Sequence, residues 1–191
     1  MPDIFVIGGP NGAGKSTAAR ELLPAFVGCV EFVNADAIAL GLSAFRPETV
    51  ALAAGRAMLN RLNELARQRM DFAFETTLAS RSFAPWLKQR QREGFGVNLI
   101  YLWLPGVELA VERVAQRVKA GGHDVPDQDI RRRYDRGRKN FIELYAPLAD
   151  TWEVYDNSGF EPHLIAFGGR DESTTVLEME PWRRIKGLNE C

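Results

Sequence analysis

The stretch GPNGAGKST, residues 9–17, combines glycines, a lysine and hydroxyl groups in a spacing that suits phosphate binding. The pattern GxxxxGK[ST] is met from Gly9 to Ser16, between an apolar run and a segment of helical composition. In such a loop backbone N–H groups surround the phosphates, the lysine reaches the β- and γ-phosphates, and the serine hydroxyl binds Mg²⁺. The predicted nucleotide-binding residues are Gly9, Asn11, Gly12, Ala13, Gly14, Lys15, Ser16 and Thr17.

Acidic and hydroxyl side chains follow two later apolar runs, where they are able to act on the bound phosphate. Asp36 comes after VEFV, and the sequence FETT places Glu75 beside Thr76 and Thr77. Because ligands of an open α/β sheet bind at the carboxyl ends of its strands, we expect these side chains to face the γ-phosphate. Two carboxylates near a phosphate are unfavourable unless a metal ion or Lys15 offsets their charge, which favours a functional role. In the alternative, Asp36 caps a helix and the threonines are ordinary strand or cap residues.

Basic residues between positions 113 and 139 form a run that can supply cations to a migrating phosphoryl group. Phosphoryl transfer requires positive charge over the transferring group, and a mobile arm that excludes water can deliver it. At helical spacing these side chains cannot all reach one site, and the others would form a solvated helix face. We therefore expect one or two contributors from the set Arg117, Arg132, Arg133 and Arg136.

The composition of the 191-residue chain restricts the remaining classes of function. A formal net charge of -1 gives no general attraction to nucleic acid or to an anionic membrane. No apolar run approaches the ~20 residues of a membrane span, and the N-terminus lacks the basic start and apolar run of a signal peptide. The two cysteines and two histidines form no CxxC motif and no zinc-ligand cluster. We expect a reduced, cytoplasmic protein without zinc and without a disulfide.

The apolar runs alternate with segments of helical composition, which predicts an α/β fold with a five-stranded parallel sheet. We expect strands at 3–9, 30–39, 71–78, 95–104 and 151–159, and helices at 15–26, 46–70, 82–94, 106–122 and 129–148. Residues 163–182 are typical of two strands joined by a polar loop, which predicts a hairpin at one sheet edge. The predicted domain is a three-layer P-loop NTPase core over residues 1–160, with a lid at about 117–138 and a hairpin extension at 161–191.

Four motifs, GPNGAGKST, NADAIA, FETTLASRS and GGHDVPDQDIRRRY, resemble in this order those of the zeta toxin family of P-loop kinases, over roughly the first 160 residues. The resemblance implies an adenylate-kinase-like core that uses ATP or GTP to phosphorylate UDP-N-acetylglucosamine on its sugar. It implies that Lys15 and Ser16 hold phosphate and magnesium, and that Asp36 is the base for the acceptor hydroxyl. It also implies an inhibitory antitoxin protein as a candidate partner.

On the acceptor side, the resemblance makes Glu75 and Thr77 substrate contacts and Arg117 a first lid arginine, but the sequence departs from the family pattern. Many members have glycine between that Glu and Thr, where this chain has Thr76. They also have an arginine two places after the Thr, where this chain has Ala79, with Arg81 two residues further on. His123 aligns with a second lid arginine, and it is either a cap for a phosphate or an ordinary loop histidine. The acceptor is therefore less well defined than the phosphoryl donor.

These residues predict a kinase that transfers the γ-phosphoryl group of ATP or GTP to a hydroxyl of a small molecule, most closely a nucleotide sugar. One alternative is a kinase for another hydroxyl substrate, which includes a sugar, an antibiotic or a polynucleotide 5′-hydroxyl. The low net charge and the lack of aromatic interleaving in the basic run weaken the polynucleotide alternative. Another alternative is a regulatory, nucleotide-binding ATPase without an acceptor. A mechanical ATPase usually has a second apolar strand that ends in Asp, whereas the strand predicted at 95–104 runs into Pro105.

Overall fold

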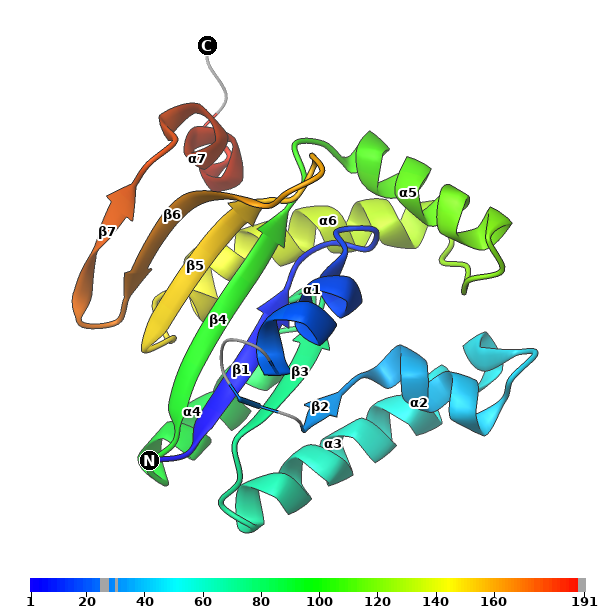
Figure 1. Ribbon diagram of the computed structural model, residues 1–191, viewed down its shortest axis with the longest axis horizontal. Coiled ribbons are helices and arrows are strands. Elements are labelled where there is room, and N and C mark those ends of the chain that lie inside the picture. Colours follow the sequence, from blue (N-terminus) through cyan, green and yellow to red (C-terminus); the bar gives the residue numbers. More distant parts are fainter. Residues whose placement is uncertain (25–27, 30, 189–191) are drawn as a thin grey trace.

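A seven-stranded sheet runs through the middle of the fold in the order β2-β3-β1-β4-β5-β6-β7 (Figure 1). The computed structural model describes residues 1–24, 28–29 and 31–188. The strands are β1 (Asp3–Gly8), β2 (Phe32–Val33), β3 (Phe72–Thr76), β4 (Gly96–Trp103), β5 (Thr151–Asp156), β6 (His163–Gly169) and β7 (Glu172–Val176). The first five strands pair in parallel, and β6 and β7 are added antiparallel at the β5 edge. The predicted α/β class is confirmed, and its five parallel strands and edge hairpin belong to one mixed sheet.

Helices cover both faces of this sheet, which gives the three layers. The helical elements are α1 (Lys15–Leu22), α2 (Ala35–Leu42), η2 (Pro47–Val50), α3 (Ala51–Arg67), α4 (Phe83–Arg92), α5 (Val107–Lys119), α6 (Asp127–Asn140), η3 (Phe141–Tyr145) and α7 (Met179–Lys186). Figure 1 shows α1 in front of the sheet, with α4 and α6 behind it. Within the described residues no single helix has the length and apolar character to cross a bilayer. Only when α2 and the segment Pro47–Arg67 are taken together do they match a span in length and composition, and these two are bent by 108° relative to each other.

The strand β1 shows why both faces of the sheet are buried. Its side chains alternate between faces, as they must in an extended strand. Ile4 and Val6 join the core beneath α3 and α4, whereas Ile7 packs with Ala19 of α1 on the other face. A strand with helices on both sides is apolar throughout, which is the pattern that made this segment recognisable in the sequence.

The start of α2 corrects the predicted strand at 30–39. Val30 lies outside the described residues, and β2 ends at Val33. The side chain of Asn34 accepts hydrogen bonds from the backbone N–H groups of Asp36 at 2.7 Å and Ala37 at 3.1 Å, so Asn34 is the N-cap of α2. Asp36 therefore lies in the first turn of a helix rather than at the end of a strand. Of the helix predicted at 15–26, residues 25–26 also lie outside the described part of the chain.

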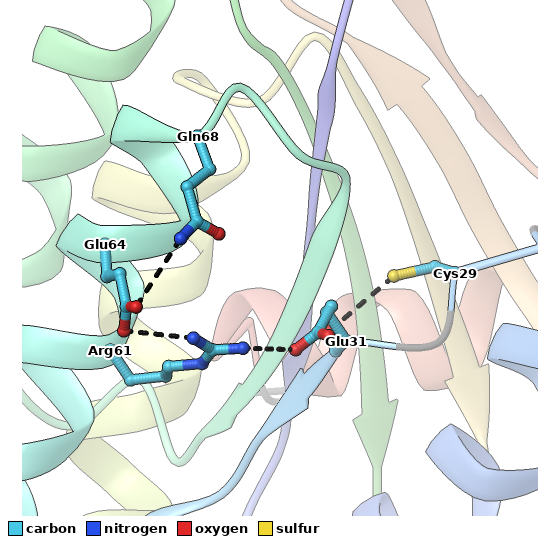
Figure 2. A network of polar contacts seen from close by, with 5 residues as sticks. All are labelled: Cys29, Glu31, Arg61, Glu64 and Gln68. Carbon is cyan, nitrogen blue, oxygen red and sulfur yellow. Dashed lines mark hydrogen bonds and ion pairs between the residues drawn. The ribbon is translucent and has the colours of Figure 1, made fainter.

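A small polar network connects the β2 edge with α3 (Figure 2). Arg61 of α3 donates from Nη2 to Glu31 at 2.9 Å and from Nη1 to Glu64 at 3.0 Å. Both pairs are partly exposed, so solvent screening keeps their contribution to stability small. The buried thiol of Cys29 is free and donates to the carbonyl oxygen of Glu31 at 3.7 Å, and Cys191 lies outside the described residues. The network holds one end of the helix that forms a wall of the site described below.

The tail contains the expected hairpin and one further element, helix α7. The ring of Trp182 on α7 is buried and stacks on Trp152 of β5, with centroids 5.6 Å apart and planes 7° apart. Arg138 of α6 donates to the carbonyl oxygen of Ile185 at 2.8 Å. The segment EPWRRI therefore forms a helix that packs against the core through Trp182.

Candidate active site

The loop between β1 and α1 requires glycine where it passes β4. Gly9 has a φ of +143°, and a Cβ at this position would lie 2.3 Å from the carbonyl oxygen of Leu102. The loop then turns through Gly14 into α1, whose first residue is Lys15. The ammonium group of Lys15 folds back and donates to the carbonyl oxygen of Pro10 at 2.9 Å. A helix N-terminus and a lysine thus face the same loop, as phosphate binding requires.

Lys15 is buried, with 7 % of its surface exposed, and both acidic and basic side chains surround its ammonium group. Burial lowers the pKa of the Lys15 ammonium below its ordinary value, because a charged group loses solvation there. The carboxylates of Glu75 and Asp36 oppose this lowering, and the guanidinium groups of Arg117 and Arg133 add to it. Four side chains predicted separately from the sequence therefore act on the loop lysine.

A hydrogen-bonded group links the start of α1 to the ends of β2 and β3. Ser16 donates from Oγ to Oε2 of Glu75 at 2.6 Å, and Asn34 donates from Nδ2 to Oγ of Ser16 at 3.3 Å. The parallel pairing of β1 with β3 places Thr76 opposite Gly8, which brings the end of FETT next to the loop. Glu75 therefore lies beside the phosphate loop, as expected from its position at the end of an apolar strand.

A cavity of about 770 Å³ extends from the loop to α3. The predicted residues that line it are Asn11, Gly12, Gly14, Lys15, Ser16, Thr17, Asp36, Glu75, Thr76, Thr77, Arg117 and Arg133. The predicted residues that do not line it are Gly9, Ala13, Arg81, His123, Arg132 and Arg136. Of these, Gly9 and Ala13 shape the loop from beneath, whereas the side chains of Arg81, Arg132 and Arg136 are exposed elsewhere.

The arginines of the α5–α6 arm differ in what they contact. Arg117 donates from Nη2 to the backbone carbonyl of His123 at 2.7 Å, and its buried Nε has no hydrogen-bond partner among the described residues. Arg133 lines the cavity from α6. Arg132 instead pairs with Asp129 at 2.6 Å, one turn earlier on the same helix. Arg117 and Arg133 are therefore the two members of the predicted set that face the cavity.

Two further residues near the loop were not selected from the sequence. Arg113, one turn before Arg117 on α5, lines the cavity and donates to the carbonyl oxygens of Asn157 and Ser158, each at 2.7 Å. Asn157 follows β5 and donates from Nδ2 to the carbonyl oxygen of Ala13 at 2.7 Å. The strand-end rule that selected Glu75 also applies to Asn157, since β5 ends one residue earlier. These contacts fasten α5 and the β5 end to the loop.

The two threonines of FETT shape the turn that follows β3. Oγ1 of Thr76 accepts from the N–H of Leu78 at 3.1 Å, and Oγ1 of Thr77 accepts from the N–H of Ala79 at 3.4 Å. Leu78 has a φ of +56°, a conformation that a leucine adopts only when its surroundings impose it. Both hydroxyls therefore support the backbone, which is the alternative role considered from the sequence, while both residues also line the cavity.

The sheet order, the phosphate loop and the cavity at the carboxyl edge define a P-loop kinase-like fold. Residues 4–139 match the AAA domain family (AAA_33), and the chain belongs to this family. An uncharacterized protein from Haemophilus influenzae (strain ATCC 51907 / DSM 11121 / KW20 / Rd) is 32% identical over 126 residues. That match spans 66% of this chain and 88% of the relative.

Solved structures show the same fold at low sequence identity. The AvrRxo1-ORF1:AvrRxo1-ORF2 complex with sulphate ions has a chain that superimposes with a TM-score of 0.78 and 18% identity, over 97% of this chain and 63% of that one. A chain in a structure of the PezAT toxin-antitoxin system of Streptococcus pneumoniae superimposes with a TM-score of 0.65 and 18% sequence identity. The match covers 87% of this chain and 71% of that one. A gluconokinase from Sinorhizobium meliloti 1021 superimposes with a TM-score of 0.52 and 16% sequence identity, over 83% of each chain.

Proposed function

We propose that this protein is a kinase that transfers the γ-phosphoryl group of ATP or GTP to a hydroxyl of a small molecule. A nucleotide sugar such as UDP-N-acetylglucosamine is the first acceptor to test. One observation carries the proposal: a single cavity contains the phosphate loop, the carboxylates of Asp36 and Glu75, and a wall of α3 beyond them. A nucleotide alone leaves that far wall without a role, whereas a second substrate would use it.

The donor half of this cavity would hold the triphosphate and its metal ion. Loop N–H groups and Lys15 would bind the phosphates. The hydroxyl of Ser16 and the carboxylate of Glu75, 2.6 Å apart, are hard oxygen ligands of the kind that Mg²⁺ prefers, so the residues present fit this ion. When bound with the nucleotide, Mg²⁺ would neutralise charge on the β- and γ-phosphates.

In the proposed reaction Asp36 orients the acceptor hydroxyl and accepts its proton. The acceptor oxygen forms a bond to the γ-phosphorus as the bond to the β–γ bridging oxygen breaks, and ADP or GDP leaves. Proton transfer occurs late, because the transition state of phosphoryl transfer is loose. Lys15 and Arg117 stabilise the charge on the transferring group. The unpartnered Nε of Arg117 supports this role, since a buried N–H group without an acceptor is unfavourable until one arrives.

The structural neighbours support the proposal at the level of the fold. They include a gluconokinase, an AvrRxo1-ORF1:-ORF2 complex with ATP and the PezAT toxin-antitoxin system. With the ordered motifs of the zeta toxin family, they make an inhibitory partner protein part of this proposal. The cytoplasmic location expected from the cysteine usage is also part of it. Neither nucleic acids nor membranes are expected partners, because the chain carries a net charge of only -1.

Mass spectrometry of reaction products tests the proposal directly. The protein is incubated with Mg²⁺ and ATP or GTP, together with a panel of nucleotide sugars, sugars and other hydroxyl-bearing metabolites. The expected result is one acceptor that gains a phosphoryl group while ADP or GDP accumulates, with no such product from a Lys15→Ala variant. ADP formation without any phosphorylated acceptor would instead define a nucleotide-binding ATPase and overturn the kinase proposal.

A further inference from the structure

A second cavity, of about 560 Å³, lies between α3 and α4, two helices that cover the same face of the sheet. The residues that line it are Asn60, Asn63, Ala66, Arg67, Arg90 and Glu93. None of these residues lines the cavity at the phosphate loop. Positions 60, 63 and 67 are three and four residues apart, so their polar side chains share one face of α3. The second cavity is therefore polar and separate from the candidate active site.

The amide group of Asn63 joins the two helices and still has a free donor. Its Oδ1 accepts a hydrogen bond from Nε1 of Trp86 on α4 at 2.9 Å. The indole of Trp86 is held in turn by edge-on contacts with Phe72 and Phe74 of β3, with ring centroids 6.3 and 6.2 Å apart. The amide oxygen of Asn63 is thus occupied, whereas its Nδ2 group has no hydrogen-bond partner in the part of the chain that the structure describes. Asn63 therefore offers the cavity a donor rather than an acceptor.

The guanidinium group of Arg90 has more donors than the surrounding protein has acceptors. Its side chain is only 11% exposed, and Nη2 pairs with Oε1 of Glu93 at 3.0 Å. Its buried Nε has no hydrogen-bond partner among the described residues. The guanidinium carbon lies 5.5 Å from the ring centroid of Trp86, a contact that uses the face of the group and not its N–H edge. Because a guanidinium carries five N–H donors, further acceptor oxygens would stabilise Arg90.

Arg67 adds a positive charge that the protein leaves without a counter-ion. It is exposed at the end of α3 and forms no ion pair with any residue that the structure describes. Glu64, one turn earlier on α3, accepts instead from Arg61 at 3.0 Å (Figure 2). Glu93, the acid that lines the cavity, is already paired with Arg90. The two arginines and one glutamate of the lining therefore leave one net positive charge at the cavity.

We propose that the α3–α4 cavity is a second ligand site, which binds a small anionic metabolite through its carboxylate or phosphate oxygens. Arg67 and the N–H edge of Arg90 hold the anionic oxygens in charge-assisted hydrogen bonds. Asn60 and Asn63 donate to the polar remainder of the ligand. The volume lies in the range of small-molecule sites, so the ligand is a metabolite rather than a single small ion. The site does not depend on the proposed kinase reaction, since the two cavities share no residue.

Calorimetry on the whole chain tests this site without any turnover. The protein is first saturated with a non-hydrolysable ATP analogue and Mg²⁺, which fill the phosphate loop, and is then titrated with succinate, glycerol 3-phosphate or glycerol. Succinate and glycerol 3-phosphate distinguish a carboxylate ligand from a phosphate ligand, and glycerol is the neutral control. At least one anionic probe is expected to bind about tenfold or more tightly than glycerol, as one charge-assisted hydrogen bond predicts. Its affinity is expected to fall as ionic strength rises.

Substitutions of arginines identify where the probe binds. Arg67→Met and Arg90→Met are each expected to weaken the anionic probe by about tenfold or more, because each removes a charge-assisted hydrogen bond. Arg67→Glu reverses the charge at an exposed position, so it decides the test even where Arg90→Met does not fold. Arg92→Met is the matched control, since this exposed arginine of the last turn of α4 lines neither of the two cavities. Its affinity for the probe is expected to stay within about twofold of the wild-type value.

Two further measurements separate this site from the phosphate loop. Lys15→Ala is expected to keep the affinity for the anionic probe, whereas loss of binding in this variant would place the probe at the loop and overturn the proposal. The probe is also expected to change the tryptophan fluorescence of the wild-type protein but not of Trp86→Phe, because Trp86 contacts both Asn63 and Arg90.

Two results of the titrations themselves would overturn the second site. One is equal affinity of the wild-type protein for glycerol and for both anionic probes. The other is an affinity for the bound anionic probe that Arg67→Met and Arg67→Glu leave as unchanged as Arg92→Met does. Because no step needs phosphoryl transfer, these results stand whether or not the kinase proposal is correct.

Discussion

The hydroxyl of Ser16 donates a hydrogen bond of 2.6 Å to Oε2 of Glu75, a residue 59 positions away in the chain. The contact joins the first turn of α1 to the carboxyl end of β3, the two elements on which the phosphate site is built. The hydroxyl expected to bind Mg²⁺ therefore lies beside a carboxylate, so the two oxygen groups that would hold the ion are adjacent.

Ser16→Ala should weaken binding of Mg²⁺·ATP far more than binding of ATP without metal. The substitution removes a metal ligand but leaves the loop N–H groups and Lys15 in place. We expect a loss of affinity of about tenfold or more in the presence of Mg²⁺, measured by calorimetry with and without a chelator. Ser16→Thr keeps the hydroxyl and is expected to bind normally. Equal losses with and without Mg²⁺ would contradict the metal role of Ser16.

Asp36→Asn should remove most phosphoryl transfer while the fold stays intact. The cap of α2 uses the backbone N–H of Asp36 and the side chain of Asn34, so the carboxylate is not needed for the helix. Loss of a general base lowers turnover by about 10²–10⁴-fold. Product formation gives kcat, and calorimetry with an ATP analogue is expected to show affinity within about twofold of the wild-type value. Near-normal turnover would exclude Asp36 as the base.

Titration of Lys15 should make the free energy of unfolding depend on pH in the alkaline range. Its pKa in the folded protein lies below the ordinary value of 10.5, chiefly because the side chain is buried. Between the lowered pKa and 10.5 the unfolded chain binds more protons, so the contribution of Lys15 to stability rises with pH in this window. The free energy of unfolding of the wild-type protein minus that of Lys15→Met should therefore increase with pH there.

Denaturant titrations at a series of pH values measure this difference. Lys119→Met, which removes an exposed lysine of α5, controls for the loss of one positive charge. A difference that falls with rising pH would mean that the Lys15 ammonium is favoured by folding. In that case the surrounding carboxylates, rather than burial, would dominate the environment of Lys15.

The residues whose position in the fold could be predicted from the sequence are those that follow from local rules. The loop from Gly9 to Ser16 is defined by a contiguous pattern, and Glu75 lies at the end of an apolar strand. Parallel strands end at the same edge of a sheet, so pairing alone brings Glu75 to the loop. The α/β order follows in the same way from alternating apolar runs and helical segments.

The residues that the sequence could not identify depend on rotation and tertiary packing. Arg132 and Arg133 are neighbours in the chain but about 100° apart around α6, so that one pairs with Asp129 and the other faces the cavity. The strand expected at 30–39 ends early because Asn34 caps a helix, which moves Asp36 into a helical turn. The cavity wall formed by α3 appears only after this helix is folded beside the loop, since its residues carry no motif.

Helix α7 should be required for the stability of the sheet edge. Trp182 is buried and stacks on Trp152 of β5, the strand to which the antiparallel hairpin is added. Trp182→Ala is expected to lower the free energy of unfolding by about 3–5 kcal/mol. Trp182→Phe keeps an aromatic ring, so its free energy of unfolding should fall by less than that of Trp182→Ala. Urea denaturation followed by circular dichroism measures both, and a loss of about 1 kcal/mol or less in Trp182→Ala would mean that α7 packs only loosely.

Gly137 of α6 should not tolerate a side chain without cost, because the backbone of the turn that follows β3 passes directly over it. A Cβ at Gly137 would lie 2.2 Å from the carbonyl oxygen of Thr77. Nearby on the same face of α6, Asn140 donates to the carbonyl oxygen of Leu78 at 2.8 Å, and Tyr145 of η3 donates to that of Ser80 at 2.5 Å. The turn that follows FETT is therefore held against α6 by successive carbonyl groups, and α6 also carries Arg133 into the cavity.

Gly137→Ala is expected to destabilise the protein by about 1–3 kcal/mol, because the methyl group must push this turn away from α6. Thr77 and Ser80 both line the cavity, so acceptor binding should weaken as well, while nucleotide binding at the loop is retained. Gly41→Ala is the matched control, since a Cβ at that glycine of α2 meets no atom within 4 Å and should be neutral or stabilising. Equal stability of the two variants would show that the turn yields without cost, and that α6 does not fix the acceptor side of the site.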